Sequence, residues 1–221
     1  GTESHYDGRS HAACYPCRAF SVPRRTHAQT TFCFSLIATR RHYQFINIMS
    51  EQLVRRSIRS FVIREGRFTE AQKRAFEMYW PAYGIDTDPR RLINLQHYFK
   101  TTQPLVMDVG FGAGDSLISL AQQRPDYNFL GIEVYRPGIG AVLQKIHALE
   151  IENIRIMNTD VLDLLTHNIA SDSCAGATIW FPDPWPKQKH SKRRLIQKEF
   201  LVAISKALKP DAILHLASDW Q

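Results

Sequence analysis

The chain has 221 residues, of which 44% are hydrophobic, enough for one domain of ordinary size with a buried core and extensions. No apolar run approaches the ~20 residues that a membrane-spanning helix needs, so we expect no membrane partner. The net charge of +7 favours a polyanionic partner, although charge alone bears on solubility and encounter more than on function.

The first 48 residues differ in composition from the rest of the chain. They are rich in Ser, Thr, His and Arg and show no sustained helix or strand period. Cys14 and Cys17 have the spacing of a metal half-site, but no second pair of ligands follows, so we predict no metal. We expect residues 1–48 to be disordered or a non-native extension, and residues 49–100 to form a basic N-terminal arm and a helix.

The basic arm leads into the first predicted helix. Residues 53–68 carry five arginines and one acid, which suits either contact with a phosphate backbone or a solvated amphipathic face. A helix is predicted from Thr69, as its N-cap, to about Trp80, where Pro81 would end it. Residues 87–99 are predicted to be a loop followed by a short helical turn.

From residue 104 onward, short apolar runs alternate with helical patterns. Near-continuous apolar runs are typical of strands buried on both faces, and they cover residues 104–110, 127–134, 153–160, 175–181 and 212–218. The helical patterns cover residues 115–124, 137–149 and 191–208. The alternation predicts an α/β fold with a mostly parallel, doubly wound sheet in residues 101–221. Because Gln221 follows the fifth strand directly, we expect this domain to be truncated at its C-terminus.

A glycine-rich turn follows the first of these strands. Asp108 precedes Gly110, Gly112 and Gly114, which permit a tight turn and let a ligand approach the backbone closely. The dinucleotide fingerprint would need a glycine at position 115, where Asp115 stands, and no G-K-[ST] follows as in a P-loop. The turn therefore indicates a ligand other than a dinucleotide or a nucleoside triphosphate.

Acidic residues end three consecutive predicted strands: Asp108, Glu133 and Asp160. Ligands of open α/β sheets bind outside the carboxyl ends of the strands. S-adenosylmethionine suits three carboxylates there, because it offers an ammonium group, ribose hydroxyls and an adenine amine, and carries no phosphate. We expect Glu133 to accept hydrogen bonds from the ribose hydroxyls, Asp160 from the adenine amine, and Asp108 to shape the loop around the amino-acid end. Any one of these acids alone could equally be a helix N-cap or a loop charge.

The segments "DVGFGAGDS", "FLGIEV", "WFPDPWPKQKHSKRR" and "LASDW", with "IRSFVIREGRFTEAQKRAFEMYWPAYG" upstream, closely resemble the bacterial tRNA (guanine-N7-)-methyltransferase family. The resemblance runs from about Arg55 to Gln221. It implies a Rossmann-like class I S-adenosylmethionine-dependent methyltransferase fold, and methylation of guanine N7 at position 46 in the variable loop of tRNA.

The resemblance also implies roles for single residues. Asp183 matches the proposed catalytic residue of the family and lines the methyl-donor pocket together with Asp108, Glu133 and Asp160. The positions that match tRNA contacts are Lys187, Lys189, His190, Ser191, Lys192, Arg193, Arg194 and Asp219. The family usually carries glutamate at the position of Asp108, a change that keeps the charge.

The predicted chemistry explains why a carboxylate stands in the loop "FPDPW". Guanine N7 is an exposed lone pair that needs no base, and the purine becomes positively charged as the new bond forms. A fixed carboxylate such as Asp183 can stabilise that charge, and Pro182, Pro184 and Pro186 restrict the backbone that holds it. Trp185 is the best candidate for stacking on the target base.

Two alternatives stay open. The chain could be a tRNA-binding fragment without activity, because the family's T-x-x-E substrate motif is not found before Gln221, or it could be another nucleic-acid methyltransferase. Cytosine-C5 chemistry fits less well, since it needs a nucleophilic cysteine in the loop and Cys174 lies before the strand. We expect tRNA as the partner, a monomer or homodimer, and a cytoplasmic location with reduced thiols.

Overall fold

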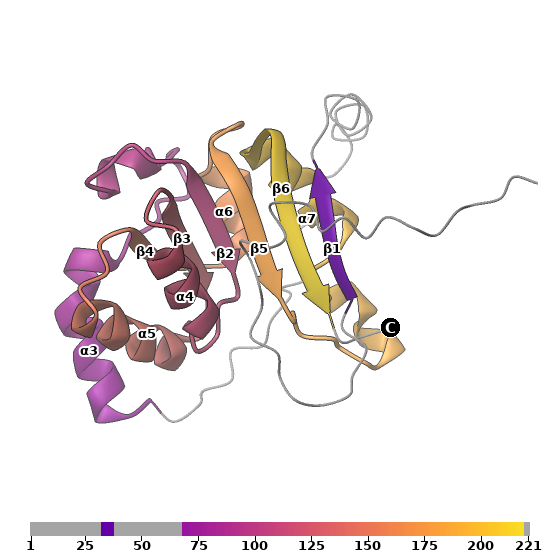
Figure 1. The fold of residues 1–221 in the computed structure, drawn as a ribbon. Helices are drawn as coiled ribbons and strands as arrows, with labels where there is room; N and C mark the ends of the chain where they lie inside the picture. The colour runs from indigo at the N-terminus through magenta and orange to yellow at the C-terminus, as the bar shows by residue number, and fades with distance from the viewer. Residues whose placement is uncertain (1–31, 38–67, 219–221) are drawn as a thin grey trace, which may run out of the picture.

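A six-stranded sheet with the strand order β1-β6-β5-β2-β3-β4 forms the centre of the computed structural model, which describes residues 32–37 and 68–218 (Figure 1). The strands are β1 (Phe32–Ile37), β2 (Leu105–Val109), β3 (Asn128–Glu133), β4 (Ile154–Asn158), β5 (Cys174–Trp180) and β6 (Leu208–Ser218). Strands β2 to β6 are parallel, and β1 is antiparallel to β6. The predicted doubly wound α/β fold is confirmed.

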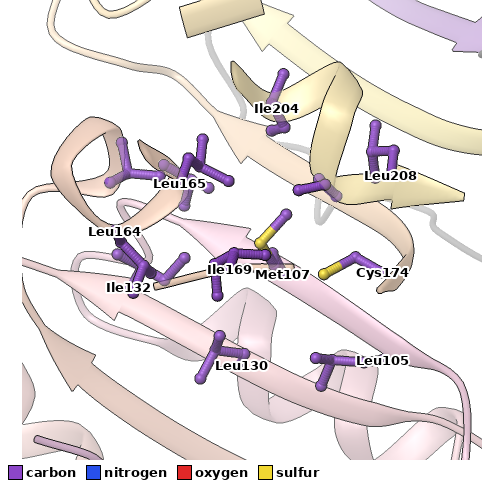
Figure 2. Close-up of a cluster of buried hydrophobic side chains, with 14 of the residues drawn as sticks. Leu105, Met107, Leu130, Ile132, Leu164, Leu165, Ile169, Cys174, Ile204 and Leu208 are labelled. Carbon is purple, nitrogen blue, oxygen red and sulfur yellow. The ribbon is translucent and has the colours of Figure 1, made fainter. Parts of the chain in front are cut away.

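Helices cover both faces of the sheet. They are α3 (Glu70–Tyr83), α4 (Asp115–Gln123), α5 (Arg136–Ala148), α6 (Val161–His167) and α7 (Lys198–Ala207), with the 3₁₀ helices η2 (Leu95–Tyr98) and η3 (Gln188–Arg193). Helices α4 and α5 share one buried core with one face of the sheet, and α6 and α7 share a second core with the other. Figure 2 shows this second core, in which Met107 and Leu130 of the sheet belong to the same cluster as Leu164 of α6 and Ile204 of α7. Within the described residues, no helix combines the length and the apolarity that crossing a bilayer requires.

Helix α3 begins as predicted but ends later. Thr69 is its N-cap and forms a capping box with Gln72. The helix continues through Pro81 to Tyr83, and the amide of Gly84 then donates to the carbonyl of Trp80 at 2.7 Å. The aromatic side chains of this last turn pack against the core shared with α5, and this burial offsets the backbone hydrogen bond that proline cannot donate.

The prediction of a helix over residues 191–208 is wrong at its start. Helix α7 begins only at Lys198, because residues 188–193 already form η3. Pro210 lies inside β6, three residues after the end of α7. It is tolerated there because the pairing of β5 and β6 jumps from Cys174↔Leu208 to Gly176↔Ile213, which leaves the residues around Pro210 in a bulge without ladder bonds.

Strand β1 and helix α6 were not predicted. Helix α6 has seven residues, too few for a clear apolar period in the sequence. The backbone of residues 32–37 pairs along β6 from Phe32↔Ser218 to Ile37↔Ile213. The other residues of 1–48, including Cys14 and Cys17, lie outside the described residues, as do residues 53–67 of the basic arm.

Candidate active site

The chain reverses its direction across the sheet between β2 and β5. From β2 it proceeds outward to β3 and β4, then returns to β5 and continues to β6 on the other side. Such a switch point opens a crevice at the carboxyl ends of the two strands, which is where ligands of open α/β sheets bind. The glycine turn follows β2, and the loop that carries Asp183 follows β5. The topology therefore brings the two segments singled out in the sequence to the same crevice.

The three glycines of the turn are needed for different reasons. Gly110, Gly112 and Gly114 have φ values of 71°, 57° and 74°, which L residues rarely adopt. A Cβ added at Gly110 or Gly112 would meet no atom within 4 Å, whereas one at Gly114 would lie 2.2 Å from Cγ2 of Val142 on α5. The first two glycines thus leave open space beside the turn, and the third permits close packing of the turn against α5.

Asp108 is fully buried at the end of β2, with an exposed fraction of 0%. The hydroxyl of Thr178 on β5 donates to Oδ1 of Asp108 at 2.7 Å, across the switch point. The second oxygen, Oδ2, is buried and has no hydrogen-bond partner among the residues that the structure describes. Burial raises the pKa of Asp108 to about 7, the bond from Thr178 opposes the rise, and the charge of Glu133 adds to it. An unpaired buried oxygen of this kind is where a cationic donor from a ligand would be most stabilised.

Glu133 holds the glycine turn against the end of β3. Its Oε2 accepts from the amide of Gly112 at 3.0 Å, and its Oε1 accepts from the amides of Val134 and Tyr135 at 2.7 and 3.1 Å. Each carboxylate oxygen has two lone pairs, so Oε2 retains acceptor capacity. The predicted ribose contact of Glu133 stays a prediction, to which the structure adds a bond that shapes the turn.

Asp160 caps a helix. It is the N-cap of α6, and its Oδ1 accepts from the amide of Leu162 at 2.8 Å. Capping was the alternative reading of this acid, and it is compatible with a ligand contact because the second carboxylate oxygen is not used in that bond. Its contact with an adenine amine stays a prediction.

The loop with Asp183 adopts an uncommon backbone conformation. Phe181 and Trp185, on either side of Asp183, have positive φ values of 51° and 43°, although neither is glycine. Asp183 itself is exposed. The amide of Phe181 donates to the carbonyl of Ala217 on β6 at 2.9 Å, which fixes the start of the loop to the sheet. Strained backbone of this kind persists only where surrounding contacts hold it, and such places cluster at functional sites.

The basic stretch after the loop folds back onto Trp185. The guanidinium of Arg193 lies 5.2 Å from the centre of the Trp185 ring, and the ring of His190 meets it edge-on at 5.6 Å. Desolvation, followed by the charges of Arg193, Lys189 and Lys187, lowers the pKa of His190.

The remaining predicted tRNA contacts lie in different environments. The lysines Lys187, Lys189 and Lys192 are exposed, and Ser191 accepts a bond through its carbonyl from the side chain of Gln197 at 2.9 Å. Arg194 donates to carbonyls of the Asp183 loop. Asp219 lies outside the described residues.

Comparison with known proteins identifies the family. The family described as "Putative methyltransferase" matches residues 102–221. The tRNA (guanine-N(7)-)-methyltransferase of Methylobacillus flagellatus is 44% identical over 176 residues, which cover 79% of this chain and 74% of the relative. That of Nitrosococcus oceani is 48% identical over 168 residues, which cover 75% and 70%. The chain belongs to the tRNA (guanine-N(7)-)-methyltransferase family. The resemblance inferred from the motifs is confirmed.

Among solved structures, the 30S ribosomal A1408 methyltransferase from an uncultured bacterium matches this member of the tRNA (guanine-N(7)-)-methyltransferase family with a TM-score of 0.41. The two are 20% identical over 60% of this chain and 61% of the other. A TM-score this low adds nothing to the argument, which depends on the sheet order and the family match.

The sequence analysis did not single out Thr178, which donates to Asp108 across the switch point. Thr178 is the one hydroxyl-bearing residue of the apolar run "AGATIWF", and this isolated polar position was the signal that could have indicated it. Arg194 was assigned to tRNA with its neighbours, and nothing in the run of charges distinguishes it from them.

Proposed function

We propose that the chain transfers a methyl group from S-adenosylmethionine to N7 of a guanine in tRNA. Beyond family membership, one observation carries the proposal. The crevice at the switch point pairs a buried carboxylate that has one unpartnered oxygen, on Asp108, with an exposed carboxylate in a strained loop, on Asp183. The first suits a cationic cofactor, and the second suits a base that becomes cationic during the reaction.

The glycine turn and its acids would hold the cofactor. Oδ2 of Asp108 would accept from the ammonium group, because an ion pair there would stabilise the ionised form that burial alone disfavours. The open space beside Gly110 and Gly112 gives room for the ligand against the backbone. Glu133 and Asp160 would accept hydrogen bonds from the ribose and the adenine, respectively. When bound, S-adenosylmethionine supplies a methyl group on a positively charged sulfur.

Asp183 would act on the guanine. The N7 lone pair is unprotonated near neutral pH, so no general base has to act before the attack. The carboxylate would accept hydrogen bonds from the donor edge of the base and stabilise the positive charge that develops on the purine ring. Its restrained loop is important because methyl transfer is an in-line displacement, in which positioning dominates the rate.

The exposed lysines Lys187, Lys189 and Lys192 suit the tRNA backbone. They follow the Asp183 loop directly, and neutralising phosphates with such residues releases counterions, which makes binding depend steeply on salt. Position 46 as the target, a contact from Asp219, a cytoplasmic location and a monomeric or homodimeric state belong to the same proposal.

The test uses the purified chain, unmodified tRNA and a methyl-labelled donor. We expect label in the tRNA, and strand cleavage by borohydride and aniline at a single guanosine of the variable loop, because N7-methylguanosine is labile to this treatment. Retention of tRNA without label would instead support a binding fragment, and label on a base that resists cleavage would support another nucleic-acid methyltransferase. The variant Asp183→Asn serves as the matched control for the reaction.

A further inference from the structure

Arg194 makes two hydrogen bonds back to the loop that carries Asp183. Its Nε donates to the carbonyl of Pro184 at 3.1 Å, and its Nη2 donates to the carbonyl of Trp185 at 3.5 Å. The guanidinium is a planar fork of donors, and here two of its arms reach the carbonyls of adjacent residues. One of those residues, Trp185, has a positive φ.

The loop needs contacts from outside because few of its own groups can stabilise its strained backbone conformation. A non-glycine residue in the left-handed region costs roughly 1–2 kcal/mol, and the loop holds two of them, Phe181 and Trp185. Pro182, Pro184 and Pro186 have no amide hydrogen, so the loop has few donors for its own carbonyls. The bond from Phe181 to Ala217 fixes only the first residue of the loop. Arg194 supplies charge-assisted donors at the other end.

The backbone at Arg194 is itself held in place. Its amide donates to the carbonyl of Ser191 at 3.1 Å and closes η3, and the side chain of Gln197 donates to the same carbonyl at 2.9 Å. The amide of His190 donates to the carbonyl of Lys187 at 2.8 Å. Because the end of η3 is fixed by these bonds, the Arg194 side chain can hold the loop in a fixed position relative to η3.

The basic stretch thus divides into two groups with different orientations. The arginines Arg193 and Arg194 contact the loop, one over the ring of Trp185 and one at the carbonyls. The lysines Lys187, Lys189 and Lys192 are exposed. An arginine that donates to two carbonyls has fewer donors left for a phosphate. The arginines therefore suit contacts with the loop, and the lysines suit contacts with phosphates.

We propose that Arg194 is a positioning residue, which holds the Asp183 loop in its strained conformation, and not a phosphate contact for tRNA. The inference rests on the proposed function in so far as the loop acts on the guanine. It predicts that Arg194 governs the rate of the reaction at saturating tRNA and leaves the electrostatic part of tRNA binding unchanged.

The test compares Arg194→Lys with Lys192→Gln. Lysine keeps the charge and loses the planar fork, so we expect Arg194→Lys to lower kcat at least tenfold while the tRNA Kd stays within about twofold and its salt dependence is unchanged. For Lys192→Gln we expect a weaker tRNA Kd and a salt slope, of log K against log salt, smaller by about one, as loss of one phosphate contact predicts. Arg90→Lys is the control for the exchange itself, because Arg90 is exposed and pairs only with nearby Asp88 in the described structure.

The opposite pattern would overturn the inference: Arg194→Lys with a weakened tRNA Kd, a smaller salt slope and an unchanged kcat. A second measurement does not depend on activity. Limited digestion with trypsin should cut after Lys187 and Lys189 several times faster in Arg194→Lys than in Arg90→Lys, because the loop loses its brace. Equal digestion rates would contradict the inference even if the chain proves to be inactive, and inactivity of the wild type with faster digestion of the variant would contradict only the proposed function.

Discussion

The glycine turn and the Asp183 loop face the same crevice, but their backbone conformations are stabilised in different ways. The turn after β2 uses glycine wherever φ is positive, and a neighbouring acid, Glu133, binds its amide. The loop after β5 places Phe181 and Trp185 at positive φ and is held by bonds from β6 and from Arg194. The turn after β2 therefore avoids backbone strain by using glycine, whereas the loop after β5 depends on contacts from β6 and Arg194 that hold non-glycine residues at positive φ. We therefore expect substitutions in the glycine turn and its acids to affect mainly stability and donor binding, and substitutions in the Asp183 loop to affect mainly the reaction.

The largest expected effect concerns the pH dependence of stability at Asp108. Its pKa is raised from 3.8 to about 7 in the folded protein. Between pH 4 and pH 7 the carboxyl group is therefore protonated in the folded state and ionised in the unfolded state. The contribution of this group to the free energy of unfolding is fully present below pH 4 and is lost as the pH rises to about 7. We expect Asp108→Asn to remove this fall, worth up to about 4 kcal/mol between pH 4 and pH 8.

Urea unfolding of both proteins without cofactor, across this pH range, measures the effect. The difference between the two unfolding free energies isolates Asp108, because all other titrating groups are shared. A difference that does not vary with pH would show that the carboxyl titrates normally.

The second expected effect tests the packing of the glycine turn. Gly114→Ala adds a Cβ that would lie 2.2 Å from Cγ2 of Val142, in a backbone conformation with φ of 74°, and we expect a loss of about 3 kcal/mol in unfolding free energy. Gly112→Ala is the matched control, since its Cβ meets open space and only the backbone term of about 1 kcal/mol applies. Thermal unfolding compares the two, and equal losses would argue against the close packing on α5.

The third expected effect is on the reaction itself. Asp183→Asn keeps the shape of the side chain and removes its charge, so we expect kcat to fall about a hundredfold, the usual effect of losing one electrostatic contact to a transition state. The affinity for the methyl donor should fall less than kcat, because the exposed Asp183 is only one of four carboxylates expected to line the donor pocket. Single-turnover kinetics and calorimetry separate the two quantities, and an unchanged kcat would remove Asp183 from the mechanism.

The smallest expected effect sharpens the role of Thr178. Its hydroxyl opposes the rise in the pKa of Asp108, so Thr178→Val should raise that pKa further, by about one unit, a typical effect of one hydrogen bond to a carboxylate. Donor binding, which we expect to need the ionised form, would then weaken at neutral pH and recover at higher pH. Thr178→Ser should restore the wild-type profile, and a profile unaffected by valine would mean that the bond has no influence on the site.

The sequence predicted the features that depend on neighbouring residues. Strand positions, the cap at Thr69 and the glycine turn all follow from local patterns of apolar residues and from the backbone freedom of glycine. The bond between Thr178 and Asp108 joins residues 70 positions apart, and no local pattern encodes it. The start of α7 was misplaced for a related reason. Residues 191–197 have a helical period, but η3 makes tertiary contacts with the Asp183 loop, and these stabilise a different conformation.

The two groups of residues within the basic stretch show the same limit. Charge identifies the stretch as a whole, but only the fold distinguishes an arginine that binds a carbonyl from a lysine that faces solvent. Asp160 illustrates the converse, since the helix cap that the sequence offered as an alternative role is observed, while its ligand contact stays a prediction.

The bond between Phe181 and Ala217 links the reacting loop to a distant part of the molecule. Ala217 stands in register with Trp180 on one side and with Cys33 of the outermost strand on the other. A shift of β6 by one position would displace the foot of the loop by about 3.3 Å and turn its inward side chains outward. The position of the Asp183 loop thus depends on the register of β6, which is paired with β5 on one side and with the edge strand β1 on the other.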